Sequence, residues 1–130
     1  DKFVGDELMA VFKGKSMVGK AVKCSVEIQK KIAVMNKKNK KNIEVGIGIN
    51  AGPMVMGAMG SKDRMDYTVL GDNVNLGARL CSAAKAGEII ISKRAVRFLP
   101  KSHSVDLRPL DPLKVKGKKD VIEVFSIILD

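Results

Sequence analysis

The segment over residues 64–80 constrains the fold of this chain more than any other part. Residues 65–70 are typical of a strand, Gly71 begins a turn, and a helix follows. On that helix Asn75 and Arg79 are four residues apart, so they share one face. An amide and a guanidinium on one side of a first helical turn are suited to hold an anion or a sugar-phosphate group.

The rest of the chain alternates strands and helices without repeats or linkers, which predicts one α+β domain over residues 1–130. The other expected elements are a hairpin over 1–12 turning at Gly5 and Asp6, a helix over 16–36, strands over 43–49, 54–59 and 88–91, a short helix from an N-capping Ser92 to Leu99, and late strands over 104–107 and 121–129.

Two of these elements carry patterns that predict packing. The helix over 16–36 has a stripe at three- and four-residue steps, which consists of Val18, Ala21, Val22, Ser25, Ile28, Ile32 and Met35. In the strand over 43–49, Gly46 and Gly48 alternate with isoleucines and a valine. We therefore expect another element to pack closely against the glycine face of this strand.

The chain is strongly basic, with 24 Lys and Arg against 14 Asp and Glu and a formal charge of +10. This charge suits a nucleic acid, an acidic membrane surface or a nucleotide, and does not choose among them. The run from Lys37 to Lys41 is interpreted as a solvated turn. Aromatic residues make up only 4% and are scattered, which disfavours RNA and single-stranded DNA.

The cysteine pattern disfavours a zinc site. Cys24 and Cys81 form no Cys-x-x-Cys motif, and His103 is the only histidine. Both thiols are expected to be free and buried, in a reducing compartment. The sequence contains no apolar run long enough to cross a bilayer and no signal peptide pattern.

The pattern Arg-x-Asp-Tyr-Thr-Val-x-Gly-Asp-x-Val-Asn-x-x-x-Arg-Leu over residues 64–80 closely resembles the signature of class III nucleotidyl cyclases, the adenylyl and guanylyl cyclase catalytic domains. Residues 1–6, Asp-Lys-Phe-Val-Gly-Asp, similarly resemble the family segment Asn-Lys-Phe-x-Gly-Asp. The resemblance implies a ferredoxin-like, palm-type βαββαβ domain, with a mostly antiparallel sheet and flanking helices.

The resemblance implies one metal-binding residue and two residues that select the purine base. It implies that Asp6 is a metal-binding carboxylate, on a tight turn that suits a hard cation such as Mg²⁺ or Mn²⁺. Lys2 and Thr68 occupy the purine-selecting positions. An ammonium at Lys2 donates to adenine N1, whereas guanine needs an acceptor there, so this pair favours ATP.

Asn75 and Arg79 match the pair that the family uses in the transition state. By resemblance, Asn75 holds the ribose and Arg79 the α-phosphate as charge grows. Lys116 resembles the lysine that contacts the triphosphate tail, with Lys114 and Lys118 as alternatives in register. Asp72 is expected to cap the helix and is assigned no catalytic role.

Together these roles imply an adenylate cyclase, which converts ATP to cyclic AMP and pyrophosphate with two divalent ions. The resemblance also implies a homodimer with active sites shared across the interface. The scattered aromatic residues argue against a nucleic acid as partner, and the lack of a long apolar run argues against membrane insertion by this segment. We expect a cytoplasmic location, which includes that of a cytoplasmic domain in a membrane-anchored or multidomain signalling protein.

The family motif Phe-x-Asp-Ile-x-Gly-Phe, which supplies the other metal-binding Asp, does not occur in residues 1–130. We therefore expect the chain to be the C-terminal portion of a catalytic domain, lacking its first strand and helices, inactive by itself and prone to self-association through open sheet edges. The alternative is a degenerate cyclase homology domain that binds nucleotide or a partner without turnover. A diguanylate cyclase is disfavoured because no Gly-Gly-Asp/Glu-Glu-Phe motif is present.

Overall fold

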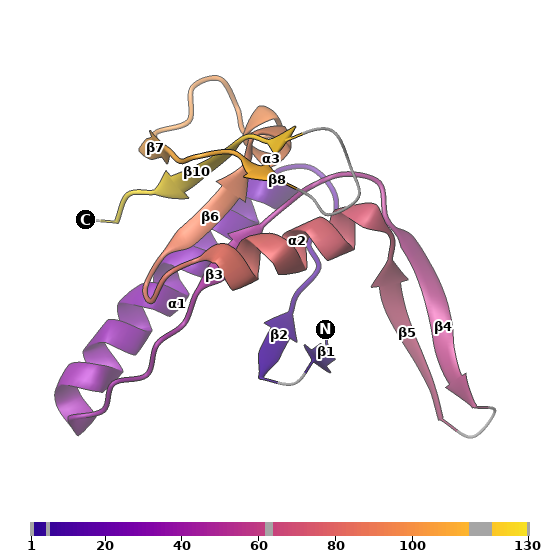
Figure 1. Ribbon diagram of the computed structural model, residues 1–130, viewed down its shortest axis with the longest axis horizontal. Coiled ribbons are helices and arrows are strands. Elements are labelled where there is room, and N and C mark those ends of the chain that lie inside the picture. Colours follow the sequence, from indigo (N-terminus) through magenta and orange to yellow (C-terminus); the bar gives the residue numbers. More distant parts are fainter. Residues whose placement is uncertain (1, 5, 62–63, 115–120, 130) are drawn as a thin grey trace.

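The computed structural model describes residues 2–4, 6–61, 64–114 and 121–129. Its helices and strands confirm the α+β composition (Figure 1). In chain order they are β1 (Lys2–Val4), β2 (Glu7–Met9), α1 (Met17–Asn39), β3 (Ile47–Ile49), β4 (Val55–Ser61), β5 (Arg64–Leu70), α2 (Asp72–Ala83), β6 (Ile89–Ser92), α3 (Lys93–Arg97), β7 (Leu107–Pro109), β8 (Leu113–Lys114), β9 (Val121–Ile122) and β10 (Val124–Ile127).

A four-stranded sheet in the order β3-β6-β10-β7 forms the centre of the fold. β3 runs parallel to β6, and β10 is antiparallel to both β6 and β7. Every residue of β6, with the sequence Ile-Ile-Ile-Ser, is buried. A continuous apolar strand of this kind belongs in a sheet that is covered on both faces.

The two long helices cover these two faces (Figure 1). Ile89 and Ile91 point to the side of α1 and join the larger apolar cluster, which includes Val18 and Val22. Ile90, between them, points to the other side and packs with Leu80 of α2. The alternation of side chains along a strand therefore places α1 and α2 on opposite sides of the sheet.

The buried face of α1 differs from the predicted stripe. The buried positions are Val18, Val22, Ser25 and Gln29. Ile28 and Met35, predicted to be in the core, are 39% and 47% exposed. Gln29 occupies the face instead because its side-chain Nε2 donates to the carbonyls of Val45, at 2.8 Å, and Glu88, at 3.4 Å. A buried amide with such partners is tolerated where an unpaired one would be costly.

Gly48 in β3 and Gly46 just before it lie against α2, as the glycine pattern predicted, although the strand expected over 43–49 is formed only over 47–49. A Cβ atom added at Gly48 would lie 2.4 Å from the backbone nitrogen of Cys81 and 2.8 Å from the carbonyl oxygen of Gly77. At Gly46 it would lie 2.9 Å from the Cβ atom of Ala84. The missing side chains thus let α2 approach the backbone of the sheet directly.

Two antiparallel hairpins flank this sheet. β1 pairs with β2 in the register Lys2 to Met9, which confirms the first predicted hairpin, although β2 ends at Met9 and does not continue to residue 12. β4 pairs with β5 over seven residues, and this hairpin projects away from the central sheet (Figure 1). β5 leads through one residue into α2, so the hairpin and the helix form a continuous unit.

The late strands also differ from the expectation. β7 lies over 107–109 where 104–107 was predicted, and the strand predicted over 121–129 is divided into β9 and β10. The division falls at Glu123, whose backbone carbonyl accepts a hydrogen bond from the Lys93 backbone N–H at 3.0 Å. β9 pairs with β8, whereas β10 pairs with β6 and β7, so the two halves serve different sheets.

Two smaller expectations need correction. The predicted turn over Lys37–Lys41 is mostly helical, because Asn39 is the last residue of α1. Lys40 caps the helix with a left-handed φ of 53°. The two cysteines, Cys24 and Cys81, are free but only half-buried. Of the helices in the described part of the chain, none combines the length and apolar character needed to cross a bilayer.

Candidate active site beside α2

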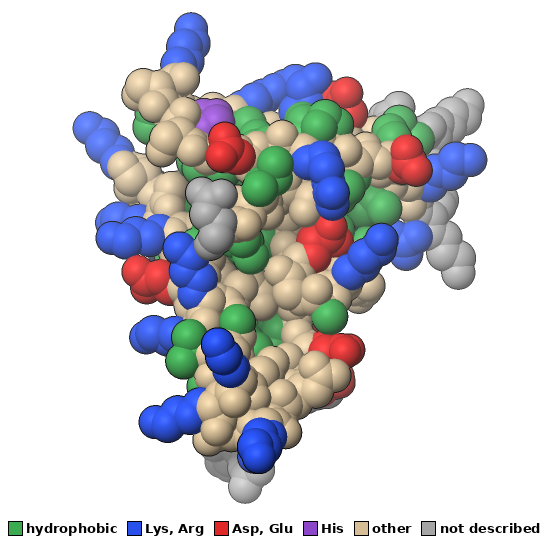
Figure 2. All heavy atoms as spheres, turned by 90° about the vertical axis from the view of Figure 1, so that its left-hand side faces the viewer, with side chains coloured by type: hydrophobic (Ala, Val, Ile, Leu, Met, Phe, Trp, Pro, Cys, Tyr) green, Lys and Arg blue, Asp and Glu red, His purple; other side chains and the backbone are tan. Residues whose placement is uncertain are grey.

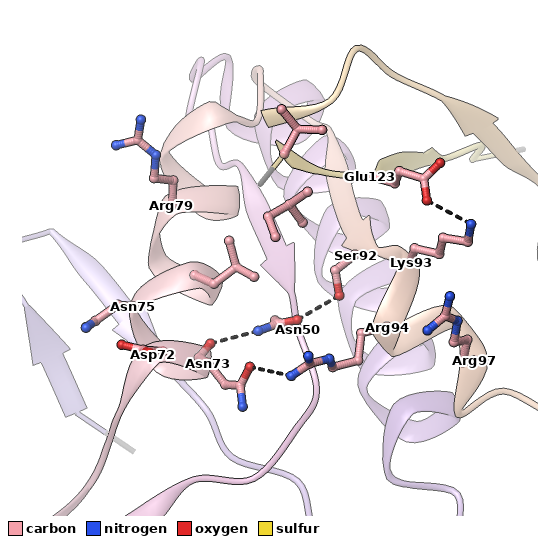
Figure 3. A pocket seen from close by; sticks show the side chains of 13 residues that line it. Asn50, Asp72, Asn73, Asn75, Arg79, Ser92, Lys93, Arg94, Arg97 and Glu123 are labelled. Atoms are coloured by element: carbon pink, nitrogen blue, oxygen red, sulfur yellow. Dashed lines mark hydrogen bonds and ion pairs between the residues drawn. The ribbon is translucent and has the colours of Figure 1, made fainter. Parts of the chain in front are cut away.

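A cavity of about 670 Å³ lies beside the N-terminal half of α2 (Figure 3). It is bounded by the end of β3, by α3 and by β9, and both Asn75 and Arg79 contribute to its wall. The full lining consists of Asn50, Asp72, Asn73, Asn75, Leu76, Arg79, Ser92, Lys93, Arg94, Arg97, Val121, Ile122 and Glu123.

Asn75 and Arg79 occupy the outer rim of this cavity. Both side chains are exposed and lie on one side of α2, as their four-residue spacing requires. Figure 3 shows them pointing away from the sheet end and from the polar groups around Asn50. Arg79 Nη2 donates to the carbonyl of Lys114 in β8 at 3.3 Å. The two groups are thus open to a ligand that approaches from outside the helix.

The start of α2 depends on Gly71, which is the N-cap residue with φ 126°. A side chain would be strained in this conformation. The Gly71 carbonyl accepts the backbone N–H of Asn75 at 3.1 Å and so closes the first helical turn. The expectation that Asp72 is the cap is wrong: Asp72 is the first residue inside the helix. Its carboxylate there lies at the positive end of the helix dipole.

A polar network fixes the same end of α2 to the sheet. Asn50, directly after β3, donates from Nδ2 to the carbonyl of Asn73 at 2.8 Å. Its Oδ1 accepts the hydroxyl of Ser92 at 2.7 Å. Ser92 Oγ also accepts the backbone N–H of Ala95 at 3.1 Å, so Ser92 caps α3 as predicted. Asn50 therefore ties the starts of α2 and α3 to one strand end (Figure 3).

Asn73 extends this network to the loop before β4. Its Oδ1 accepts Arg94 Nη1 at 3.0 Å, and its Nδ2 donates to the carbonyl of Pro53 at 2.7 Å. Gly52 permits this contact, because a Cβ atom there would lie 2.5 Å from Asn73 Nδ2. The sequence analysis did not identify Asn50, Asn73 or Arg94. The one local signal was an asparagine directly after a buried strand, at Asn50.

The cavity wall carries more positive than negative charge. Its cations are Arg79, Lys93, Arg94 and Arg97, and its acids are Asp72 and Glu123. A hydrogen bond and ion pair with the Lys93 ammonium, at 2.7 Å, lower the pKa of Glu123 below its usual range, and Arg97 adds to this effect. Glu123 thus stays ionised and neutralises Lys93, which leaves the arginines to attract an anionic ligand.

Of the other predicted site residues, only Asp6 has a described side chain, and it lies outside the lining of this cavity. Asp6 is exposed in the β1–β2 turn. Lys2 lies in β1 and Thr68 in β5, opposite Gly57, but their side chains are outside the described part of the structure. Lys116 also lies outside the described residues.

The fit to a metal ion depends on Asp6. An exposed carboxylate at a tight turn is a suitable oxygen ligand for Mg²⁺ or Mn²⁺. Within residues 2–4, 6–61, 64–114 and 121–129, no three His, Cys, Asp or Glu side chains come together as a metal-binding group. Asp6 therefore fits as a single ligand and not as part of a complete set within the described residues.

The family model for the adenylate and guanylate cyclase catalytic domain matches residues 2–128. This chain belongs to that family. The resemblance to the class III adenylyl and guanylyl cyclase catalytic domains is thereby confirmed.

Curated relatives include adenylate cyclases. The chain is 32% identical over 139 residues to an adenylate cyclase specific to terminal differentiation from Dictyostelium discoideum, with 98% of this chain and 6% of the relative covered. It is 34% identical over 138 residues to an adenylate cyclase from Anabaena cylindrica, with 98% and 27% covered. The chain thus spans only a small part of these relatives.

Solved structures confirm the palm-type cyclase fold. The adenylyl cyclase CyaB from P. aeruginosa superposes with a TM-score of 0.85 at 30% identity, covering 100% of this chain and 71% of CyaB. The guanylate cyclase domain of RhGC from Catenaria anguillulae, solved in complex with GTP, gives a TM-score of 0.77 at 27% identity and covers 89% and 62%.

Proposed function

We propose that this chain serves as an adenylate cyclase domain that converts ATP to 3′,5′-cyclic AMP and pyrophosphate. In this reaction the ribose 3′ oxygen loses its proton to solvent and bonds to the α-phosphorus. The bond from that phosphorus to the oxygen bridging the α- and β-phosphates breaks, and pyrophosphate leaves with the electron pair. The observation that carries the proposal is the joint exposure of Asn75 and Arg79 at the rim of a basic cavity.

Asn75 and Arg79 are the groups proposed to act at the reacting centre. The α-phosphoryl group gains negative charge as the new bond forms, and a guanidinium within hydrogen-bond reach stabilises this charge. The Asn75 amide orients the ribose, which brings the 3′ oxygen into line with the α-phosphorus. The Gly71 turn and the Asn50 network support this role, because they fix the start of the helix that carries both side chains.

Lys2 and Thr68 are proposed to select adenine. The ammonium of Lys2 donates to adenine N1, and the hydroxyl of Thr68 accepts from the exocyclic amine. Guanine carries an N–H at N1, so with guanine the ammonium of Lys2 would face another donor. The adenylate cyclases among the relatives support this choice, while the guanylate cyclase structure shows that the fold also serves GTP.

Asp6 and Lys116 are proposed to act on the phosphates. Asp6 would hold a divalent ion, and such an ion supplies Lewis-acid stabilisation of phosphate charge. Lys116 would contact the triphosphate tail as a mobile positive charge. The excess of cations in the cavity wall supports a polyanionic substrate.

We further propose that two copies form each active site. Asp6 does not line the cavity that Asn75 and Arg79 share, and a site divided between two copies accounts for this separation. Metal-binding carboxylates would come from one copy, and Lys2, Thr68, Asn75 and Arg79 from the other.

Product analysis of the natural full-length protein tests the proposal. With ATP and Mg²⁺ or Mn²⁺ it should form cyclic AMP, and Asp6→Ala should abolish this. The double variant Lys2→Glu, Thr68→Cys should shift preference toward GTP. Binding of ATP with no cyclic product under either metal would refute the enzymatic reading in favour of a binding module. An unchanged base preference would refute only the assignment of Lys2 and Thr68.

A further inference from the structure

The outward face of α1 carries an almost uninterrupted array of lysines. Residues 17–41 contain eight lysines and one acid, Glu27, and all of these side chains are exposed. The lysines are Lys20, Lys23, Lys30, Lys31, Lys37, Lys38, Lys40 and Lys41. The buried residues of α1 face the sheet, so the helix period places four lysines of the helix on the opposite side and two on its flank. The four are Lys20, Lys23, Lys31 and Lys38, and the two are Lys30 and Lys37.

An apolar side chain sits at the centre of this array. Val34 is 64% exposed, and the residues three and four positions before and after it are Lys30, Lys31, Lys37 and Lys38. These are the positions that surround a residue on a helix surface. Met35, next to it, is 47% exposed. The surface therefore combines a ring of cations with an exposed apolar centre, which is hereafter called the α1 lysine face.

Among the described residues, no salt bridge involves a lysine of the α1 lysine face, and its one acid, Glu27, offsets a single charge. The salt bridges among these residues join Lys93 to Glu123 and Arg108 to Glu88. Like charges three and four residues apart destabilise a helix by themselves. Figure 2 faces the left-hand side of Figure 1, where α1 ends, and shows many Lys and Arg side chains there, with hydrophobic and fewer acidic side chains between them.

We propose that the α1 lysine face binds the surface of a membrane containing anionic phospholipids. A helix of 23 residues is about 35 Å long, so it offers a straight row of charges to a flat partner. Each lysine near such a surface is attracted by the negative lipid headgroups, and Val34 and Met35 enter the boundary between headgroups and acyl chains. The helix lies in the plane of the surface and does not cross it.

The apolar centre favours a lipid surface over a nucleic acid. Both partners present phosphates to lysine, but only the lipid boundary removes Val34 from water. α1 contains no arginine and no aromatic residue, the side chains that most often read guanine or stack on bases. Because α1 and α2 cover opposite sides of the sheet, this binding leaves the cavity beside Arg79 open. The inference is thus independent of the proposed reaction.

Flotation with lipid vesicles tests the inference on the chain itself. The chain should float with vesicles of phosphatidylcholine containing about 30 mol % phosphatidylserine, not with phosphatidylcholine alone, and should be released by about 0.5 M KCl. Replacing Lys30, Lys31, Lys37 and Lys38 by glutamine should lower the partition coefficient at least about tenfold. The matched control replaces Lys13, Lys15, Lys85 and Lys101, which are also exposed, with the same change in charge. An equal loss in both variants would overturn the proposal in favour of net charge alone.

A second measurement reports on the apolar centre. The chain has no tryptophan, so Val34→Trp introduces a single fluorophore. Its emission should shift to the blue when anionic vesicles are added, whereas Phe98→Trp, at another exposed position, should not shift. No shift at residue 34 despite flotation would overturn the assignment of this face. Binding of duplex DNA through the same lysines without vesicle binding would overturn the choice of partner.

Discussion

The contact between Gly48 and α2 gives the sharpest test of how the fold positions the site. A Cβ atom at residue 48 would lie 2.4 Å from the Cys81 nitrogen, 2.8 Å from the Gly77 oxygen and 2.8 Å from the Leu80 carbonyl carbon. All three are backbone atoms of the helix, so none can rotate away as a side chain would. Gly48→Ala must therefore push α2 away from β3.

The cost can be worked out from this geometry. Adding one methyl group to a well-packed interior costs about 1–3 kcal/mol, and contact with rigid backbone places Gly48→Ala in the upper part, about 2–3 kcal/mol. For a chain of 130 residues this corresponds to a fall in Tm of roughly 6–12 °C. The shift of α2 also displaces Asn75 and Arg79, so nucleotide turnover should fall with stability.

Thermal unfolding followed by circular dichroism measures this effect, with Gly19→Ala as the matched control. Gly19 lies in α1, and a Cβ atom there meets nothing within 4 Å. Gly19→Ala should raise the free energy of unfolding by about 0.5–1 kcal/mol, because alanine favours the helix and glycine does not. If Gly48→Ala were as stable as the unaltered chain, the close approach of α2 to β3 would be wrong.

Two other predictions concern stability and thiol chemistry. Asn50→Ala removes the hydrogen bonds that tie the end of β3 to α2 and α3, and it should lower the free energy of unfolding in urea by about 1–3 kcal/mol. The control Asn42→Ala, at an exposed position, should change this free energy by less than about 0.5 kcal/mol. Equal effects of the two substitutions would contradict the network. Burial, with the Glu7 carboxylate, raises the pKa of Cys81, while a backbone hydrogen bond opposes this. The folded state thus favours the neutral thiol, and this preference stabilises the fold. The stabilisation is fully present below the pKa of the thiol in the unfolded chain, and it is lost as the pH rises through the pKa of the thiol in the folded chain. With the other cysteine replaced by serine, alkylation of Cys81 should reach half its maximal rate at a higher pH in the folded than in the unfolded chain; equal midpoints would refute the shift.

The sequence predicted those parts of the fold that depend on local pattern. Glycines alternating in the strand before Asn50 predicted a close neighbour, and Ser92 predicted a helix start; both are confirmed. The prediction of a buried Ile28 in α1 is wrong, because a hydrophobic pattern assigns isoleucine to the core in preference to the neighbouring Gln29. Only the folded chain supplies the two carbonyls that satisfy this amide.

The candidate site could likewise be predicted only where one local pattern determines it. Asn75 and Arg79 share a face because of their spacing on one helix, so the sequence was sufficient to pair them. Asn50, Asn73 and Ser92 are at least nineteen residues from one another in the sequence and meet only through the order of strands β3 and β6. No periodicity connects them, and their network could not be predicted. The roles of all the predicted site residues stay predictions: Lys2, Asp6, Thr68, Asn75, Arg79 and Lys116.

Cyclic AMP formation by an Arg79→Ala variant of the natural full-length protein tests the central claim most directly. Loss of one donor to the developing phosphate charge should reduce the turnover rate by about 10²–10³-fold. Arg108→Ala is the matched control, because Arg108 is exposed on β7 and does not line the cavity. We predict turnover within about twofold of the unaltered protein for this control, as expected of a surface substitution. Equal turnover in the two variants would contradict the claim that the outer face of α2 acts on the nucleotide.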